Sequence, residues 1–304
     1  MTDPAPLSVV VIPLVGGAAL ASCLARLPEH GVECIVVLRQ ADDPDAWSCR
    51  IPGPRFVRAA ADPVPLRRQQ GIQIASGPIV ALLEDTTWPG DQWCDAVRSG
   101  FADDNVAAVG GPITISDDLP ARFQALGWSE YGAFTPGRFA RLAVGEPRSG
   151  SYAVTRLPGN NLAYRRTDVL DLLRNGRDGL LENLVGSALR AGGRTLACVP
   201  AMSADYAVAD HHGAALRTRL NHGRLYMASV ASDPSLLRRA ALLAKAAVLP
   251  PVLLRRTVAA ISGSRPPVPW LRVMLWAALI ETAWAAGEAL GAVAGAGDSL
   301  ERWR

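Results

Sequence analysis

The chain has 304 residues, of which 49% are hydrophobic and 19% charged, and its formal net charge is +3. This length suits one large α/β domain with an appendage or two small domains, and the apolar content argues against disorder. A charge this small does not indicate nucleic-acid binding. Lys245 is the only lysine, an arginine bias that a GC-rich genome would produce, although guanidinium groups also suit diphosphates.

Five apolar runs in the first two hundred residues are predicted to be strands, with helical patterns between several of them. These runs are 8–12, 34–38, 56–57, 79–83 and 106–109. They are continuous rather than alternating, which is typical of parallel strands covered on both faces. Residues 117–152 are irregular and indicate a functional loop or substrate lid. A helix over 181–191 and a last strand over 195–199 are expected after it.

The C-terminal part changes character. Two apolar stretches, 240–254 and 270–296, are separated by a Gly- and Pro-rich linker, and arginines flank the first. Lys245, Glu281 and Glu288 interrupt them, so neither provides the roughly twenty uncharged residues of a membrane span. We expect a helical pair lying in the membrane interface, with a soluble hairpin as the alternative. The predicted domains are therefore 1–235 and a membrane-associated 236–304.

The cysteines and the N-terminal residues indicate the cellular compartment of the protein. The five cysteines form no C-x-x-C pair and no metal-ligand spacing, which favours a reducing cytosolic environment. The first residues lack a basic segment, so we expect no signal peptide.

Glu84 and Asp85 close the apolar run 79–83. Acidic groups at the carboxyl edge of a buried parallel strand lie where open α/β sheets bind ligands. Taken alone, the pair would more commonly end a strand and begin a solvated loop. The neighbouring segments favour a binding site.

Five segments in order resemble a glycosyltransferase of family 2, which has the GT-A fold. They are the opening strand 9–13, the helix and strand 68–80, the acidic Glu84-Asp85-Thr86, the segment 159–166, and 182–194. The resemblance covers about residues 8–206. It implies an α/β fold with a mostly parallel sheet flanked by helices, to which the C-terminal helical pair is added.

The resemblance implies a nucleotide-sugar donor site. Glu84 takes the position of the first acid of the family's Asp-x-Asp motif, and Thr86 replaces the acid that holds the metal. Asp85 is then the candidate ligand for a divalent cation, Mg²⁺ or Mn²⁺. Arg68 matches a basic donor-binding position, and Arg138 and Arg141 are further candidates for the phosphate charge.

The resemblance also implies which residues form the acceptor side of the active site. Glu182 is the candidate base that takes the acceptor proton, and Asn183 follows it where the family often has Asp. Its alternative role is a helix N-terminal acid. Asn160 and Asn161 would position substrates, or simply form a turn.

Nucleobase recognition is not assigned by the sequence. The family often has an Asp just after the second strand, where this chain has Leu38-Arg39-Gln40 and only later Asp42 and Asp43. His211 and His212 have no spacing typical of a metal site.

The sequence thus predicts an inverting glycosyltransferase at the cytosolic face of the membrane, acting on a lipid-linked or cell-envelope glycan. Its partners would be a nucleotide sugar and, through residues 236–300, the membrane surface. No nucleic-acid partner is expected. A membrane-docked scaffold that has lost catalysis is the main alternative. A dinucleotide-dependent oxidoreductase fits poorly, because no G-x-G-x-x-G follows the first strand.

Overall fold

A computed structural model describes residues 7–51, 53–144, 150–174, 179–207, 215–231, 235–262 and 270–303. Contacts divide the chain into two compact units, residues 1–114 with 134–208, and residues 115–133 with 209–304. The boundary predicted near residue 235 therefore falls inside the second unit. His211, His212 and most of the predicted linker lie outside the described residues.

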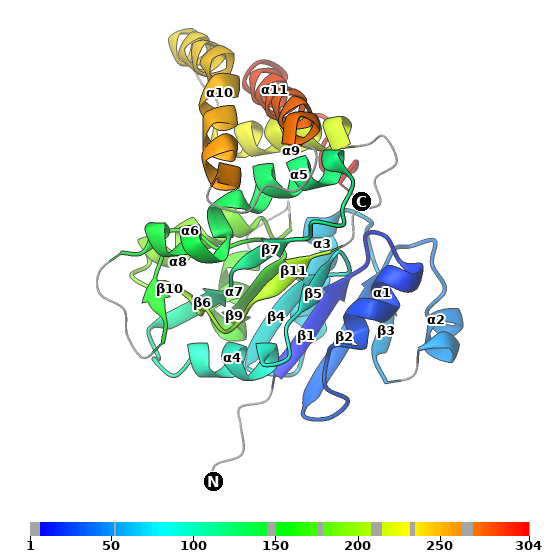
Figure 1. Ribbon diagram of the computed structural model, residues 1–304. Coiled ribbons are helices and arrows are strands. Elements are labelled where there is room, and N and C mark those ends of the chain that lie inside the picture. Colours follow the sequence, from blue (N-terminus) through cyan, green and yellow to red (C-terminus); the bar gives the residue numbers. More distant parts are fainter. Residues whose placement is uncertain are drawn as a thin grey trace. The chain divides into compact units, whose positions relative to one another are not determined.

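The first unit contains an eight-stranded sheet with the strand order β3-β2-β1-β4-β9-β6-β10-β8 (Figure 1). Its strands are β1 (Leu7–Ile12), β2 (Val32–Leu38), β3 (Arg55–Arg58), β4 (Ile79–Glu84), β6 (Val106–Gly110), β8 (Tyr152–Ala153), β9 (Asn161–Arg165) and β10 (Thr195–Cys198).

Parallel pairing dominates one half of this sheet. Strands β3, β2, β1 and β4 are parallel to their neighbours, and β6 is parallel to β10. Strand β9 lies antiparallel between β4 and β6, and β8 is antiparallel to β10. The predicted α/β architecture, with a mostly parallel sheet flanked by helices, is confirmed.

Helices cover both faces, which explains the continuous apolar runs. The helices of this unit are α1 (Gly17–Leu24), α2 (Pro44–Arg50), α3 (Val64–Ile74), α4 (Trp93–Gly100), α6 (Pro136–Phe139), α7 (Arg166–Leu173) and α8 (Glu182–Ala191), with the 3-10 turns η1 (Gly132–Phe134, which begins in the second unit) and η2 (Ala140–Leu142). Helices α1 and α4 share one apolar core with Val9 and Val11 of β1. On the opposite face, α3 approaches β1 so closely that a Cβ on Gly71 would lie 2.3 Å from Val10 Cγ1.

Three segments differ from the sequence-based expectation. The sequence Asp-Asp-Pro-Asp at 42–45 is typical of a loop, yet α2 begins there, because the Asp43 side chain accepts a hydrogen bond from Asp45 N and Pro44 begins the helix. The sequence Trp-Pro-Gly-Asp at 88–91 is typical of a turn, yet its first residues belong to strand β5 (Thr87–Pro89), in a small sheet of order β5-β11-β7 with β11 (Ala204–Tyr206) and β7 (Ile113–Ile115). The irregular stretch 117–152 includes a helix, α5 (Ala121–Tyr131).

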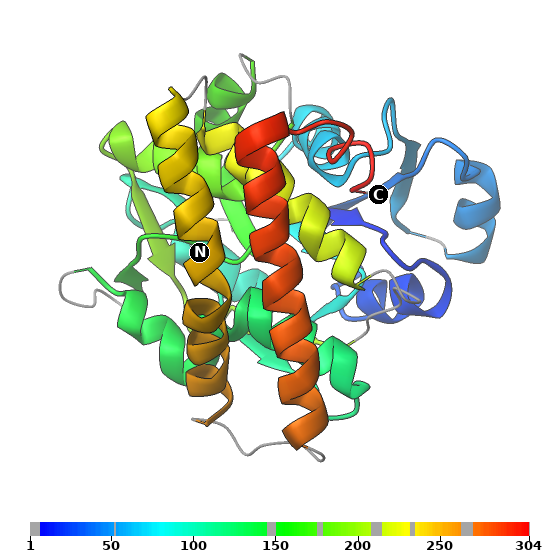
Figure 2. The same cartoon turned by 90° about the horizontal axis from the view of Figure 1, so that it is seen from above.

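The second unit is helical. It consists of α5, α9 (Ala215–Val230), α10 (Leu236–Ser262) and α11 (Trp270–Ala294). Helices α10 and α11 run side by side (Figure 2), which agrees with the predicted C-terminal helical pair. Helix α10 continues through Pro250 and Pro251, where the sequence indicated a break.

Glycines allow α9 and α11 to touch backbone to backbone. A Cβ on Gly223 would lie 2.3 Å from Trp284 O, and one on Gly287 would lie 2.1 Å from Leu220 O. One turn further along α11, a Cβ on Gly291 would lie 2.4 Å from Arg224 O. No side chain larger than hydrogen fits at these three positions.

The two acids that interrupt the apolar stretch of α11 are buried and paired. Glu281 accepts a hydrogen bond of 2.8 Å from Thr257 of α10. Glu288 forms an ion pair of 3.2 Å with Lys245 of α10 and accepts a hydrogen bond from Trp284. These residues interrupt the apolar pattern because they hold the helical pair together.

One helix among the described residues, Trp270–Ala294, is long and apolar enough to cross a membrane by length and composition. Core helices of soluble proteins pass the same test, and 44% of its most apolar window is buried.

Candidate active site

Sheet pairing brings the acidic motif and the paired asparagines together. Ile12 of β1 lies beside Glu84 of β4, and Leu83 lies beside Asn161 of β9. Because β9 runs antiparallel to β4, its first residues lie at the carboxyl edge where the acidic motif follows β4. Segments that are about 75 residues apart in sequence therefore share one edge of the sheet.

Strand alternation decides where Glu84 points. Leu83 belongs to the core formed with α1 and α4, so its successor Glu84 faces α3 on the opposite side. There Arg68 of α3 donates from Nη2 to Glu84 Oε1 at 2.6 Å. Both side chains are almost completely buried, with exposed fractions of 3% for Arg68 and 8% for Glu84.

Glu182 reaches the same guanidinium from α8. Arg68 Nη1 lies 3.2 Å from Glu182 Oε2, and the Glu182 side chain is 21% exposed. The segment leading into α8 is fixed on α3, where Leu180 N donates to Pro65 O. Gly179 makes this docking possible, since its φ is +75° and a Cβ would lie 2.4 Å from the Pro65 carbonyl carbon.

A second glycine makes room for the Glu182 carboxylate. A Cβ on Gly159 would lie 2.9 Å from Glu182 Cδ and Oε1. The Gly-Asn-Asn segment therefore borders the candidate base directly. One buried arginine between two carboxylates, one of them partly exposed, is the central geometric feature of this site.

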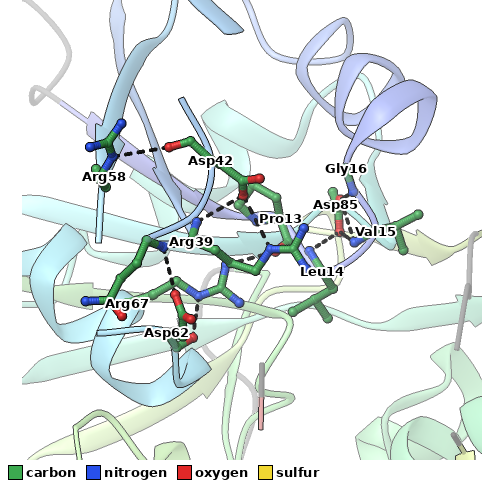
Figure 3. Close-up of polar contacts among 11 residues, drawn as sticks. Pro13, Leu14, Val15, Gly16, Arg39, Asp42, Arg58, Asp62, Arg67 and Asp85 are labelled. Carbon is green, nitrogen blue, oxygen red and sulfur yellow. Dashed lines mark hydrogen bonds and ion pairs between the residues drawn. The ribbon is translucent and has the colours of Figure 1, made fainter. Parts of the chain in front are cut away.

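Asp85 was expected to bind a metal ion, but its partners in the structure are backbone N–H groups. Its carboxylate accepts hydrogen bonds from the backbone N–H groups of Leu14 at 2.8 Å, Val15 at 3.1 Å and Gly16 at 2.6 Å (Figure 3). Burial raises the pKa of Asp85, and the three N–H donors oppose that rise. The carboxylate thus orders the loop between β1 and α1.

Two oxygens at this edge are buried without a protein partner among the described residues. Asn160 donates to Thr87 Oγ1 at 2.8 Å, while its own Oδ1 has no partner. The hydroxyl of Thr86 also lacks one. Buried oxygens rarely remain unsatisfied, so these atoms indicate where water or ligand polar groups bind.

Asn161 has the contacts of a structural residue. Its Oδ1 accepts from Trp93 Nε1 at 2.7 Å, and its Nδ2 donates to Met202 O at 2.8 Å. Both ends of the amide are therefore used to tie α4 and the segment after β10 to the sheet.

A second polar cluster lies at the ends of β1 and β2 (Figure 3). Its central residue, Arg67, was not among the predicted site residues. Arg67 is fully buried and donates to Pro13 O at 2.8 Å and Asp62 O at 2.9 Å. Burial lowers its pKa to about 10. Asp42, a candidate for nucleobase recognition, instead accepts from Arg39 Nε at 3.3 Å. The adjacent Arg67-Arg68 pair on a helix was the available sequence signal for Arg67.

Arg138 and Arg141 lie close together at α6 and η2. Burial and the neighbouring charge of Arg141 lower the pKa of Arg138. The two cations therefore form one positively charged feature of the first unit.

The acidic motif does not supply the donor set of a metal site. Glu84 is paired with Arg68, Asp85 is bonded to backbone N–H groups, and Thr86 has no charge. Mg²⁺ and Mn²⁺ are bound mainly through carboxylate oxygens. Across the described ranges, no three His, Cys, Asp or Glu residues lie close enough to hold a metal ion.

Comparison with known proteins supports the fold class that this sheet and edge define. No family model matches the chain, and no curated protein matches it. Solved structures similar to this chain are GT-A glycosyltransferases, and the chain shares their fold.

One similar structure is the mannosyltransferase PcManGT from Pyrobaculum calidifontis in complex with GDP-Man and Mn²⁺, at TM-score 0.51 and 18% identity over 93% of this chain and 88% of that one. Another is GalNAc-T7 with UDP, GalNAc and Mn²⁺, at TM-score 0.50 and 14% identity over 68% of this chain. This chain spans 45% of the length of GalNAc-T7.

Proposed function

We propose that this protein is an inverting glycosyltransferase that moves a sugar from a nucleotide-sugar donor to a lipid-linked or cell-envelope glycan acceptor. The observation that supports it best is the Glu84–Arg68–Glu182 bridge at the carboxyl edge of the sheet in a GT-A fold. Glu182 is partly exposed there, as a base that meets a substrate must be.

Glu182 acts as the general base in this proposal. Its carboxylate takes the proton of the acceptor hydroxyl, whose oxygen attacks the anomeric carbon of the donor sugar. The bond from that carbon to the phosphate oxygen breaks, and the nucleoside diphosphate leaves with the bonding electrons. Attack from the face opposite the leaving group inverts the anomeric centre.

The donor lies at the carboxyl edge of the sheet, where Thr86 follows β4 and Asn160 precedes β9. Asn160 offers its unpartnered Oδ1 to a sugar or acceptor hydroxyl, and Thr86 offers its hydroxyl. Asp85 contributes indirectly by ordering the loop 14–16. Both similar structures contain Mn²⁺, whereas the carboxylates of the acidic motif are already engaged here, so no step is assigned to a metal.

Membrane association is the second part of the proposal. Helix α11 exposes Leu271, Leu275 and Leu279, which are four residues apart, and further along it exposes Leu290 and Val293. Helix α10 exposes Leu237, Val248 and Val252. Arginines such as Arg255 and Arg256 accompany these residues and suit anionic lipids. We propose that this face of the second unit lies on the cytosolic surface of the membrane.

Replacement of the base tests the catalytic part. Glu182→Gln should lower the release of nucleoside diphosphate from UDP- and GDP-sugars by about 10²- to 10⁴-fold, the usual contribution of a general base. A total lipid extract supplies the acceptor. Binding of UDP or GDP, measured by calorimetry, should stay within about threefold because the leaving group does not contact the base.

Glu29→Gln is the matched control, since Glu29 is an exposed carboxylate of the same unit. Equal turnover in the Glu182→Gln and Glu29→Gln proteins would remove Glu182 from the mechanism. Nucleotide binding without turnover by the unmodified protein, over a broad donor panel, would favour the scaffold.

A further inference from the structure

We propose that Arg68 is a positioning residue for the base: it holds Glu182 toward the acceptor, while the same guanidinium anchors itself on Glu84. This inference rests on the proposed glycosyl transfer. It assigns Arg68 a role different from direct contact with the donor phosphates.

The first step is that Arg68 has no free charge to offer a diphosphate. Its two terminal nitrogens face two carboxylates, at 2.6 Å and 3.2 Å, and its side chain is 3% exposed. The described partners of the guanidinium are thus two carboxylates, whose charges offset its own attraction for a phosphate.

The second step is that the Glu84 and Glu182 carboxylates are both positioned by rigid secondary-structure elements. Glu84 ends a central strand, and its partner α3 is pressed onto β1 at Gly71. Glu182 begins α8, whose entry is docked on α3 at Pro65, one turn before Arg68. The planar fork of arginine suits such a bridge, because its two ends can donate to two acceptors in fixed directions.

The third step is the asymmetry between the two acids. Glu84 is buried, while Glu182 keeps an exposed fraction of 21% and borders Gly159. Arg68 therefore presents only one of its two partners to a substrate. A bridge serving stability alone would bury both partners, because an exposed ion pair contributes little.

The described charged and titratable groups that face Glu182 are few. Arg68 of α3 is the cation, and Glu84 lies behind it. Tyr164 of β9 is buried, and its pKa is raised by that burial and further by the charge of Glu182. Without Arg68, Glu182 would lose the ion pair that the described residues give it.

The experiment compares Arg, Lys and Met at position 68 in the Glu84→Gln background. Removing Glu84 first avoids an unpaired buried charge, which would otherwise destabilise the fold. The Glu84→Gln/Arg68→Met protein then differs from its Glu84→Gln parent chiefly in the missing partner of Glu182. Arg68→Lys is also made without the Glu84 change, since one ammonium cannot bridge two carboxylates.

We expect Glu84→Gln/Arg68→Met to have a kcat about 10- to 100-fold below that of Glu84→Gln. Lysine in the Glu84→Gln background should restore much of the lost kcat, because its ammonium can still pair with Glu182. The Kd for UDP or GDP should change by less than about threefold throughout the series.

Three results would overturn the inference. An unchanged kcat in an active series, or a loss confined to nucleotide binding, would show that Arg68 serves the donor or the fold. The proposed function would survive either result. Absence of both turnover and UDP or GDP binding in the unmodified protein would overturn the inference together with the proposed function.

Discussion

Three consecutive residues of the acidic motif have three different surroundings. Glu84 faces α3 and pairs with Arg68, Asp85 turns to the backbone of the β1–α1 loop, and Thr86 is buried with an unpartnered hydroxyl. At the residue scale, each carboxylate is thus engaged by groups of the protein itself. This differs from a metal site, where the ion would be the main partner of the carboxylates.

A carboxylate at position 86 should change the response to metal. We expect the unmodified protein to bind UDP or GDP with similar affinity in Mn²⁺ and in EDTA. Thr86→Asp should bind at least about tenfold more tightly in Mn²⁺ than in EDTA, because it adds the missing oxygen ligand. Isothermal titration calorimetry measures both.

Thr86→Asn is the matched control, since it has the shape of Asp without the charge. It should show no gain with Mn²⁺. Binding by the unmodified protein that requires Mn²⁺ would contradict our account of the acidic motif.

At the scale of elements, packing is set by glycines where two backbones meet. Gly71 lets α3 approach β1, Gly179 lets the entry to α8 dock on α3, and Gly223 and Gly287 let α9 and α11 touch. The first two determine where Arg68 and Glu182 lie. The last two determine how the helices of the second unit pack.

Gly287→Ala should therefore destabilise the second unit. Its Cβ would lie 2.1 Å from Leu220 O, a backbone atom that can move only with its helix. Overpacking of this kind costs about 1–3 kcal/mol, which should lower the melting temperature of the transition by several degrees. Differential scanning calorimetry resolves the change.

Gly137→Ala provides the comparison, because nothing lies within 4 Å of a Cβ at that helical position. It should leave the melting temperature unchanged or raise it slightly. Equal melting of both variants would mean that α9 and α11 are not in backbone contact.

At the scale of the whole molecule, a GT-A unit and a helical unit have different surfaces. The first unit buries its apolar residues in one sheet covered on both faces. The second also buries apolar residues, together with Glu281 and Glu288, and in addition exposes leucines and valines of α10 and α11. A group of exposed apolar side chains is typical of a surface that meets an apolar partner.

Charge placed on that surface should release the protein from membranes. The intact chain should float with vesicles of phosphatidylglycerol and phosphatidylcholine. Leu275→Glu with Leu279→Glu should lower the bound fraction at least about tenfold, because each exposed leucine contributes roughly 1.5–3 kcal/mol on burial. These side chains are 60% and 52% exposed, so the protein should still fold.

Leu184→Glu is the matched control, at a leucine of α8 that is 39% exposed in the first unit. It should bind vesicles like the unmodified chain. Equal flotation of the double variant would overturn the membrane proposal. A change from dimer to monomer in gel filtration, without a change in flotation, would show that a second copy covers this surface.

The sequence by itself determined the elements and their class. Continuous apolar runs predicted β1, β2, β4 and β6, because strands covered on both faces need no polar alternation. Helices α3, α8 and α11 were predicted close to their observed bounds. Helices α2 and α5 were not, because the Asp- and Pro-containing start of α2 resembles a turn and because α5 packs against α11, which is distant in sequence.

Only the tertiary structure decided what the polar residues do. The sequence singled out Arg68, Glu84 and Glu182, yet their bridge depends on strand alternation, on two helix dockings and on glycines that admit close approach. The sequence likewise gave no indication that Asp85 would be hydrogen-bonded to backbone N–H groups, or Asn161 to Trp93 and Met202. Residue type fixes which bonds a side chain can form, whereas the neighbours that accept those bonds arrive from distant parts of the chain.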